Sequence, residues 1–107
     1  MVLMDTEWIK IINQVFEMEK KVAAKPEMAT LQRNIDRIKT SLEAMQITYH
    51  NPIGEKYSET RTDCEANIVG ELKNDMVIAD VIKPVIFNAE QGSPVIVQKA
   101  VVLVQNK

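Results

Sequence analysis

The chain has 107 residues, of which 46% are hydrophobic and 26% charged, enough for one modest hydrophobic core. Its 13 Lys and Arg residues are nearly balanced by 15 Asp and Glu residues, so a net charge of −2 gives no electrostatic attraction to nucleic acid or to an anionic membrane. A single cysteine excludes an internal disulfide, and no recognisable secretory leader opens the sequence. No apolar run reaches the ~20 residues that a membrane span needs. We therefore expect a cytoplasmic protein.

The first predicted element is a helix over residues 8–22. Its apolar side chains recur at intervals of three and four residues, which is the period of one helix face, and they are Trp8, Ile11, Val15, Met18 and Val22. Asp5 or Thr6 is suitable as the N-cap because a short polar side chain can accept a hydrogen bond from a free backbone N–H group. The sequence therefore predicts an amphipathic helix that begins near residue 5.

A second helix of the same kind is predicted after Pro26. Proline removes a backbone hydrogen bond and clashes with the preceding turn inside a helix, so we place a turn or sharp kink at Ala24 to Pro26. Two forms remain open, a helical hairpin and one long kinked helix. The second stripe has the same spacing and consists of Met28, Leu31, Ile35, Ile38, Leu42 and Met45.

The two stripes predict a helical dimerisation segment over residues 1–46. One hairpin has too few large apolar side chains to cover both stripes, so we expect a homodimer with a four-helix bundle. The alternative is that the stripes pack on the second half of the same chain. The residues predicted at the dimer interface are Trp8, Ile11, Val15, Met18, Val22, Leu31, Ile35, Ile38 and Leu42.

Residues 47–107 are predicted to form a small all-β module, which makes the fold class α+β. Asn51, Pro52 and Gly54 indicate a turn near the start of this module, and the polar stretch that follows predicts a loop over residues 50–65 with Tyr57 as its anchor. Because loops of this length are unusual in a compact domain, the stretch is either a functional loop or a short helix.

Three later runs rich in Val and Ile read as strands joined by hairpins: Ala66–Leu72, Met76–Phe87 and Pro94–Gln105. Pro84 is expected to divide the second run because proline cannot donate to a sheet ladder. The last run is apolar on both faces except at Gln98 and Lys99, so most of it is expected to be covered on both sides. The polar pair is a candidate contact point.

The residues that carry chemistry do not form a recognisable catalytic or metal-binding pattern. His50 is the only histidine and Cys64 the only cysteine, so a zinc site or a Cys-His dyad would lack its remaining groups. The acidic residues of the 50–65 loop are interspersed with Lys56 and Arg61, as in a solvated loop, and three glycines are too few for a phosphate-binding loop. We therefore expect no enzyme activity and no cofactor; an enzyme would require His50 or the acidic loop to converge in a concave pocket.

Several motifs resemble those of a known family. The segment Gly54-Glu55-Lys56-Tyr57-Ser58-Glu59, followed by Thr62-Asp63-Cys64, is similar to Gly-x-x-Phe-Asp-Pro and the His-Glu-Ala-like triplet of the GrpE family, nucleotide exchange factors for DnaK-type chaperones. The family's closing strands are similar to Val81-Ile82-Lys83-Pro84-Val85, Gly92 and Val97-Gln98-Lys99-Ala100-Val101-Val102. The likeness extends from about Trp8 to Val104. Here Gln98 replaces an arginine, Pro84-Val85 replaces Gly-Tyr, and the family's long N-terminal helix is missing.

The resemblance implies a dimeric co-chaperone without catalytic residues. Its β module would bind the nucleotide-binding domain of a DnaK-type chaperone and promote ADP release. The competing hypothesis is a non-catalytic dimeric adaptor or structural subunit whose β module binds a different protein. Under the first hypothesis, the predicted partner-binding residues are Tyr57, Arg61, Asp63, Pro84, Val85, Gln98 and Lys99.

Overall fold

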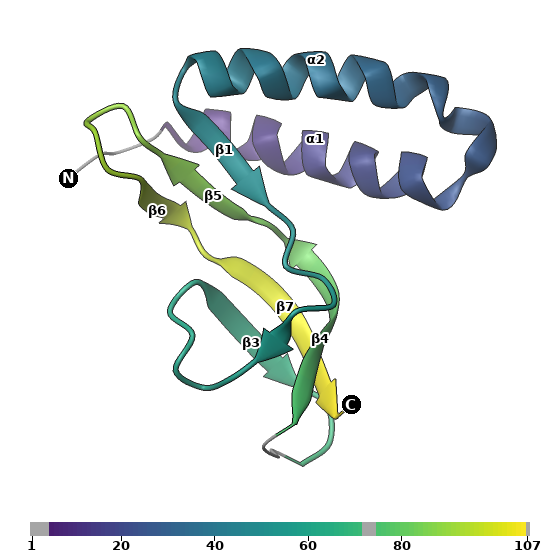
Figure 1. Cartoon of the computed structure of the whole chain (residues 1–107), viewed down its shortest axis with the longest axis vertical. Helices are drawn as coiled ribbons and strands as arrows, with labels where there is room; N and C mark the ends of the chain where they lie inside the picture. Colours follow the sequence, from purple (N-terminus) through teal and green to yellow (C-terminus); the bar gives the residue numbers. More distant parts are fainter. Residues whose placement is uncertain (1–4, 72–74, 107) are drawn as a thin grey trace.

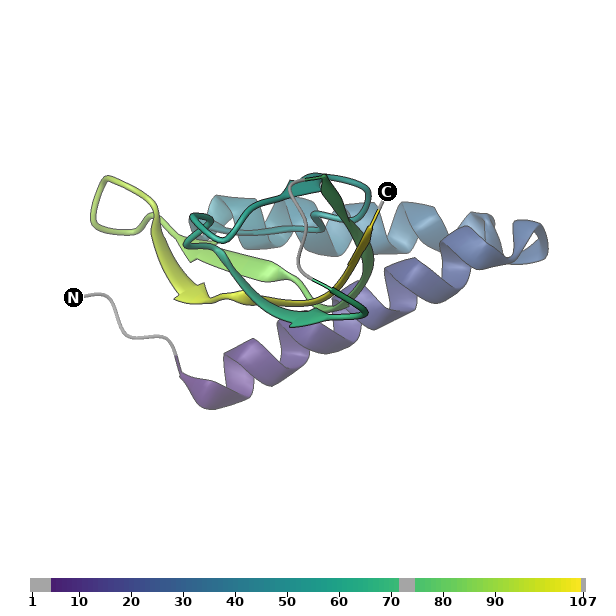
Figure 2. The same cartoon turned by 90° about the horizontal axis from the view of Figure 1, so that it is seen from below.

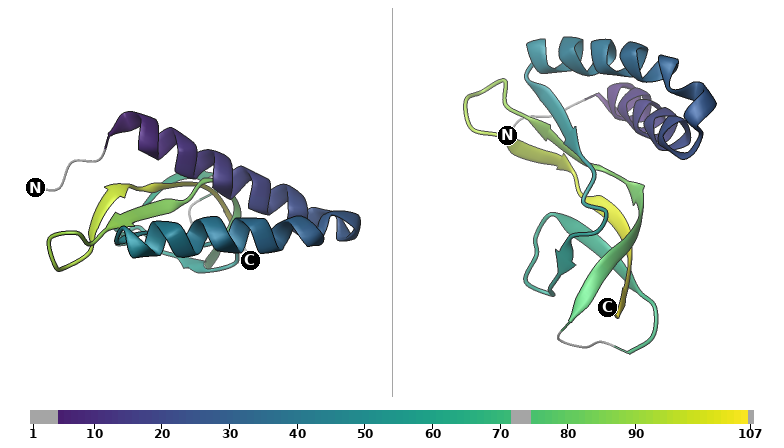
Figure 3. Two further views of the ribbon diagram at one scale, coloured as in Figure 1. Left: turned by 90° about the horizontal axis from the view of Figure 1, so that it is seen from above. Right: turned by 45° about the vertical axis from the view of Figure 1, so that its right-hand side comes forward.

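The computed structural model describes residues 5–71 and 75–106 and has an α+β architecture (Figure 1). Two antiparallel helices lie over a three-stranded sheet, and a four-stranded sheet extends away from them. The helices lie close together at the turn that joins them and diverge toward their other ends, as Figure 2 and the left view of Figure 3 show. We call these two ends of the pair the turn end and the open end.

The helical pair is a hairpin and not one long kinked helix. Helix α1 (Thr6–Ala24) is capped by Asp5, whose side chain accepts a hydrogen bond of 2.8 Å from the backbone N–H group of Glu7. It ends before Pro26, which begins the short 3-10 helix η1 (Pro26–Met28), and α2 (Thr30–Ala44) then runs back along α1. The predicted turn at Ala24 to Pro26 is thus confirmed. Neither helix is long and apolar enough to cross a membrane.

The strands form two sheets. The three-stranded sheet has the order β1-β5-β6, with β1 (Ile47–His50), β5 (Val85–Asn88) and β6 (Val95–Gln98) all antiparallel. The four-stranded sheet has the order β2-β4-β7-β3. It contains β2 (Lys56–Tyr57), β3 (Cys64–Ile68), β4 (Met76–Lys83) and β7 (Ala100–Asn106), and only the β3–β7 pair is parallel.

Two long segments of the chain pass from one sheet to the other at a common point. Pro84 separates β4 from β5, as predicted, because proline has no N–H group for the ladder. Lys99 likewise separates β6 from β7, so the last apolar run is two strands and not one. The side-chain amide of Gln98 donates a hydrogen bond of 3.0 Å to the carbonyl oxygen of Pro84, which fixes the two breaks side by side. We call this point the crossing.

The prediction for the first part of the β module is wrong in three respects. Residues 50–65 are not one long loop or helix, since β2 and the start of β3 lie within them. Strand β1 was not predicted. Strands β3 and β4 do not form a hairpin, because β7 lies between them. The apolar pattern of a sequence indicates which residues are extended but not which strands pair. Leu72, the last residue of the predicted run Ala66–Leu72, lies outside the described residues.

The core consists of three clusters of buried side chains that meet at Tyr49. One lies between α1 and α2, one between the helices and the three-stranded sheet, and one inside the four-stranded sheet with Phe16 of α1. Tyr49 packs against all three, and its hydroxyl group donates a hydrogen bond of 2.7 Å to Glu19 of α1. The helices therefore share their core with the β strands.

Candidate functional site

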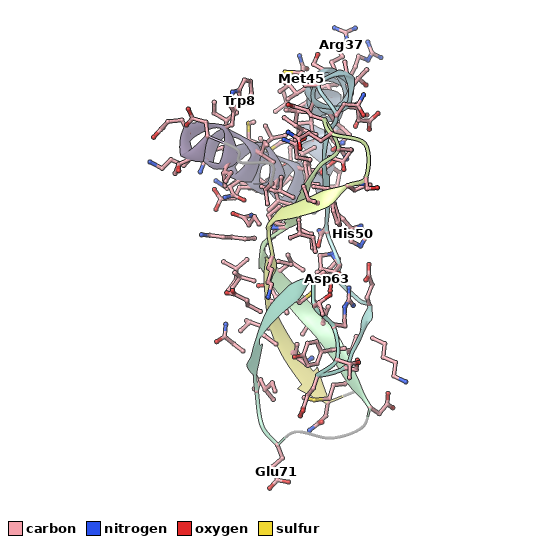
Figure 4. The ribbon with its side chains drawn as sticks, turned by 90° about the vertical axis from the view of Figure 1, so that its left-hand side faces the viewer. Trp8, Arg37, Met45, His50, Asp63 and Glu71 are labelled. Carbon is pink, nitrogen blue, oxygen red and sulfur yellow. The ribbon has the colours of Figure 1, made fainter. Side chains whose placement is uncertain are left out.

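The helical hairpin presents an apolar surface on its outward face. Four side chains of the stripes are buried within the chain, namely Val15, Val22, Ile35 and Leu42, and Met28 is partly buried. The other six remain between 38% and 50% exposed, and they are Trp8, Ile11, Met18, Leu31, Ile38 and Met45. Figure 4 labels Trp8 and Met45 at the helical end of the molecule, away from the four-stranded sheet. We call these six exposed residues the outward face.

The outward face contains a hollow near the turn end. Its volume is about 270 Å³, and it lies between α1 and α2. The lining residues are Met18, Lys21, Val22, Met28, Leu31, Asn34, Ile35 and Ile38. Apart from Lys21 and Asn34 these side chains are apolar, so the hollow accepts an apolar group.

The predicted dimer interface is therefore divided between two roles. Five of the nine predicted residues lie on the outward face, where a second chain can reach them. The four buried residues are covered within the chain. Leu42 clusters with the strand residues Ile47 and Ile86, as the alternative of packing on the β half expects, whereas the other three form the cluster between the helices. Met45 belongs to the outward face although it was not among the predicted interface residues.

A second feature is a series of side-chain hydrogen bonds and ion pairs that joins the end of β1 to the start of β3. His50 is hydrogen-bonded to Glu55, and Glu55 accepts a hydrogen bond of 3.0 Å from Arg61. Arg61 binds Asp63 with two hydrogen bonds of 3.0 and 2.9 Å and also donates to the carbonyl oxygen of Lys56. This series, His50-Glu55-Arg61-Asp63, is called the charged chain, and it orders a segment that the sequence indicated as a solvated loop.

The pKa values of the charged chain follow from these contacts. The hydrogen bonds from Arg61 hold the pKa of Asp63 below its usual value despite partial burial. Burial would raise the pKa of Glu55, but hydrogen bonds from His50 and Arg61 outweigh it and lower that pKa. Both carboxylates therefore stabilise the folded protein in their charged form.

Acid is expected to weaken the fold through these two carboxylates. Because their pKa values are lower in the folded state than in the unfolded chain, their contribution is complete at neutral pH and is lost as the pH falls from ~5 toward their folded-state values. Urea unfolding between pH 7 and 3 is expected to show a shallower loss of stability in Arg61→Gln than in the parent protein. Arg33→Gln, at an exposed position of α2, is the control, and identical slopes for both variants would contradict the assignment.

Cys64 lies at the end of the charged chain but is unsuited to nucleophilic chemistry. It is buried, and burial together with its hydrogen bond to Asp63 raises its pKa to about 11. At neutral pH the group is therefore the weakly nucleophilic thiol and not the thiolate. Among residues 5–71 and 75–106, no three His, Cys, Asp or Glu side chains are placed to hold a metal ion.

The structure brings four of the predicted partner-binding residues together at the crossing. The carbonyl oxygen of Asp63 accepts a hydrogen bond of 2.9 Å from the N–H group of Ala100, so the Arg61-Asp63 end of the charged chain adjoins the break at Gln98-Lys99. Lys99 is exposed, whereas Gln98 is partly buried. The side chain of Gln98 is also paired with that of Asn13 in α1 by two hydrogen bonds, of 3.1 and 2.9 Å.

The other three predicted partner-binding residues are covered within the chain, wholly or in part. Pro84 lies at the crossing and Val85 follows it, but both side chains are buried, and this burial removes them from the predicted contact surface. Tyr57 pairs with Met76 across β2 and β4 and is partly covered by the core of the four-stranded sheet. Pro84 was predicted as a contact because proline interrupts a β run, but it marks the junction between β4 and β5 and is not exposed.

Sequence reasoning missed two residues that organise the site. Tyr49 connects the three core clusters. The sequence offered one signal for this role: Tyr49 lies two positions after the buried Ile47 and therefore on the same face of a strand. Asn13 binds Gln98 from a position 85 residues away, and no local pattern reports such a contact. No protein family, curated protein or solved structure matches the chain.

Proposed function

We propose that the protein is a homodimeric, non-catalytic exchange factor that binds the nucleotide-binding domain of a DnaK-type chaperone and promotes ADP release. The observation that carries this proposal is the crossing. Asp63 belongs to one of the motifs, with the predicted contact Arg61 beside it, and Gln98 and Lys99 belong to another; the hydrogen bond from Ala100 to Asp63 joins the two segments. These are motifs that resemble the GrpE family, so their proximity favours one binding surface.

The crossing has the properties of a preorganised contact surface. Arg61 is fixed by Glu55, Asp63 and the carbonyl oxygen of Lys56, and Gln98 is fixed by α1 and by Pro84. A surface whose side chains are already ordered loses less conformational entropy on binding. Lys99 stands exposed beside them and supplies a positive charge for an acidic patch on the partner.

The outward face supports the homodimer. Six large apolar side chains in one exposed surface are more than isolated surface residues, and such a surface usually marks a contact with another chain. Two hairpins that meet by these faces form a four-helix bundle, which buries the apolar side chains of both copies.

Exchange activity then requires only differential binding. If the β module binds the open, nucleotide-free state of the chaperone more tightly than the closed state, ADP affinity falls by the same factor. A coupling free energy of ~1 to 3 kcal/mol corresponds to a change of roughly 5- to 150-fold. No side chain of this protein needs to take part in bond making or breaking.

Stopped-flow release of a fluorescent ADP analogue from a DnaK-type chaperone of the same organism tests the proposal. The protein is expected to accelerate release, and Lys99→Glu is expected to remove most of the acceleration because it reverses the exposed charge at the crossing. Lys25→Glu, the same change at the turn end of the hairpin, is the control. If a folded dimer gives no acceleration, the exchange function is wrong and the adaptor hypothesis takes its place.

A further inference from the structure

A pair of side-chain amides joins the helical hairpin directly to the crossing. Asn13 of α1 and Gln98 at the end of β6 exchange two hydrogen bonds, of 3.1 and 2.9 Å, in which each amide donates to the other. The second N–H group of Gln98 donates to the carbonyl oxygen of Pro84 at 3.0 Å. Both N–H groups of Gln98 are therefore used within the chain, and its side chain acts as an internal link.

The bond to Pro84 gives this amide pair a single orientation. The carbonyl oxygen of Pro84 can only accept a hydrogen bond, so the NH2 group of Gln98 has to face it. A flipped Gln98 amide would place two oxygen atoms against each other. The oxygen of Gln98 therefore faces the NH2 group of Asn13, and the link between helix and crossing has one arrangement.

Asn13 lies on a firmly packed part of α1. Ile12, immediately before it, is 0% exposed and clusters with Ile86 of β5. Phe16, one turn later, is 1% exposed and lies in the core of the four-stranded sheet. Asn13 itself is partly buried. A side chain on a helix that is held by buried neighbours is a precise support for a binding surface.

The backbone of Lys99 is held from both sides at the crossing. On one side Gln98 is linked to α1, and on the other the N–H group of the buried Ala100 donates to the carbonyl oxygen of Asp63 at 2.9 Å. Lys99 belongs to neither β6 nor β7, so its position depends on these two anchors. It forms no ion pair with any residue that the structure describes, and its ammonium group is exposed.

From these contacts we infer that Asn13 is a positioning residue of the partner-binding surface, which acts through Gln98 to hold the exposed Lys99 in place. The inference rests on the proposed function and gives α1 a second role beside dimerisation. Because the amide pair belongs to both regions, docking of α1 on the strands and binding of a partner at the crossing are expected to strengthen each other.

Hydrogen exchange of the free protein tests the positioning step without any chaperone. Asn13→Ala removes the partner of Gln98, and α1 is expected to stay intact because alanine is the best helix former. The N–H group of Ala100, next to Lys99, is expected to exchange roughly 5-fold faster, as for the loss of one hydrogen bond, while that of Val102 in the middle of β7 keeps its rate. A general loss of stability would instead raise both rates together.

The control for this measurement is Gln14→Ala. It removes another amide side chain from α1, at the next position, where Gln14 is exposed and bonded only to Glu17 of the same helix. The exchange rate of Ala100 is expected to stay at the parent value in this variant. Equal Ala100 rates in Asn13→Ala and Gln14→Ala would overturn the inference.

A double-mutant cycle tests the connection to partner binding. The dissociation constant for a nucleotide-free DnaK-type chaperone is measured for the parent protein, Asn13→Ala, Lys99→Glu and the double variant. Asn13→Ala is expected to weaken binding about 5-fold, and Lys99→Glu is expected to have a smaller effect in its presence than in the parent, because a displaced lysine contributes less.

Two outcomes separate this inference from the proposed function. If the fold effects of Asn13→Ala and Lys99→Glu simply multiply, Asn13 does not act through Lys99 and the inference is overturned, although exchange activity stands. If the parent protein binds no chaperone but the Ala100 rate responds as expected, the exchange function is wrong, while the positioning of Lys99 by Asn13 is supported.

Discussion

Ile38→Gln is expected to shift the proposed dimer toward the monomer at micromolar concentrations. Ile38 lies at the middle of the outward face of α2, so the dimer loses the burial of two isoleucine side chains. Burying a whole isoleucine side chain contributes ~1.5 to 3 kcal/mol, but only 38% of Ile38 is left for a second copy to cover. About 1 kcal/mol is therefore lost on each copy, and the dissociation constant rises by about 10-fold or more. Sedimentation equilibrium over a dilution series measures this change directly.

The matched control is Arg37→Gln, which introduces the same residue one position earlier, on a different side of α2. Arg37 is exposed and lies outside the apolar stripe, so the dimer mass is expected to stay unchanged. Both variants should keep the helix content of the parent protein because glutamine is a good helix former. A dimer that is as stable with Ile38→Gln as with Arg37→Gln would contradict the proposed interface.

Phe16→Ala is expected to lower the free energy of unfolding by about 3 to 5 kcal/mol. Phe16 is 1% exposed and is the side chain of α1 that enters the core of the four-stranded sheet. It also makes an edge-to-face contact with Tyr49, with 6.1 Å between the ring centroids. Since a typical domain is stable by ~5 to 15 kcal/mol, this one change removes much of the stability of the chain.

Urea unfolding followed by circular dichroism measures the effect. Ile11→Ala is the control on the same helix, because Ile11 is 50% exposed and its truncation leaves the core intact. The comparison requires protein concentrations at which dimerisation does not contribute, or the Ile38→Gln background. A loss below ~1 kcal/mol for Phe16→Ala would mean that the helices and the β strands do not share a core.

The helices could be predicted from the sequence, but the role of each apolar residue could not. Ile11 and Val15 belong to the same stripe, yet Val15 is buried between the helices and Ile11 is exposed. Helical spacing shows that a residue lies on the apolar side of a helix. It does not show whether the second helix, the sheet or another chain covers that residue, because this depends on how the hairpin sits on the sheet.

The charged chain could have been recognised in part. Arg61 and Asp63 are two positions apart, and side chains at this spacing lie on the same side of an extended segment. With that local pair in mind, the other acidic and basic residues of the 50–65 stretch indicate an ordered segment and not a solvated loop. The contacts of Gln98 with Asn13 and Pro84 could not be predicted, because each joins segments far apart in the sequence.

The order of the strands in the four-stranded sheet has a consequence for biosynthesis. Strand β7 is translated after all the other strands that the structure describes, yet it lies between β3 and β4. While the chain emerges from the ribosome, β3 and β4 have no common partner until residues 100–106 are available. The pairing of β3 with β7 also links residues such as Cys64 and Ala100 that are distant in sequence, which is typical of slow-folding topologies. Premature termination before Ala100 would thus remove the centre of the sheet, not an edge.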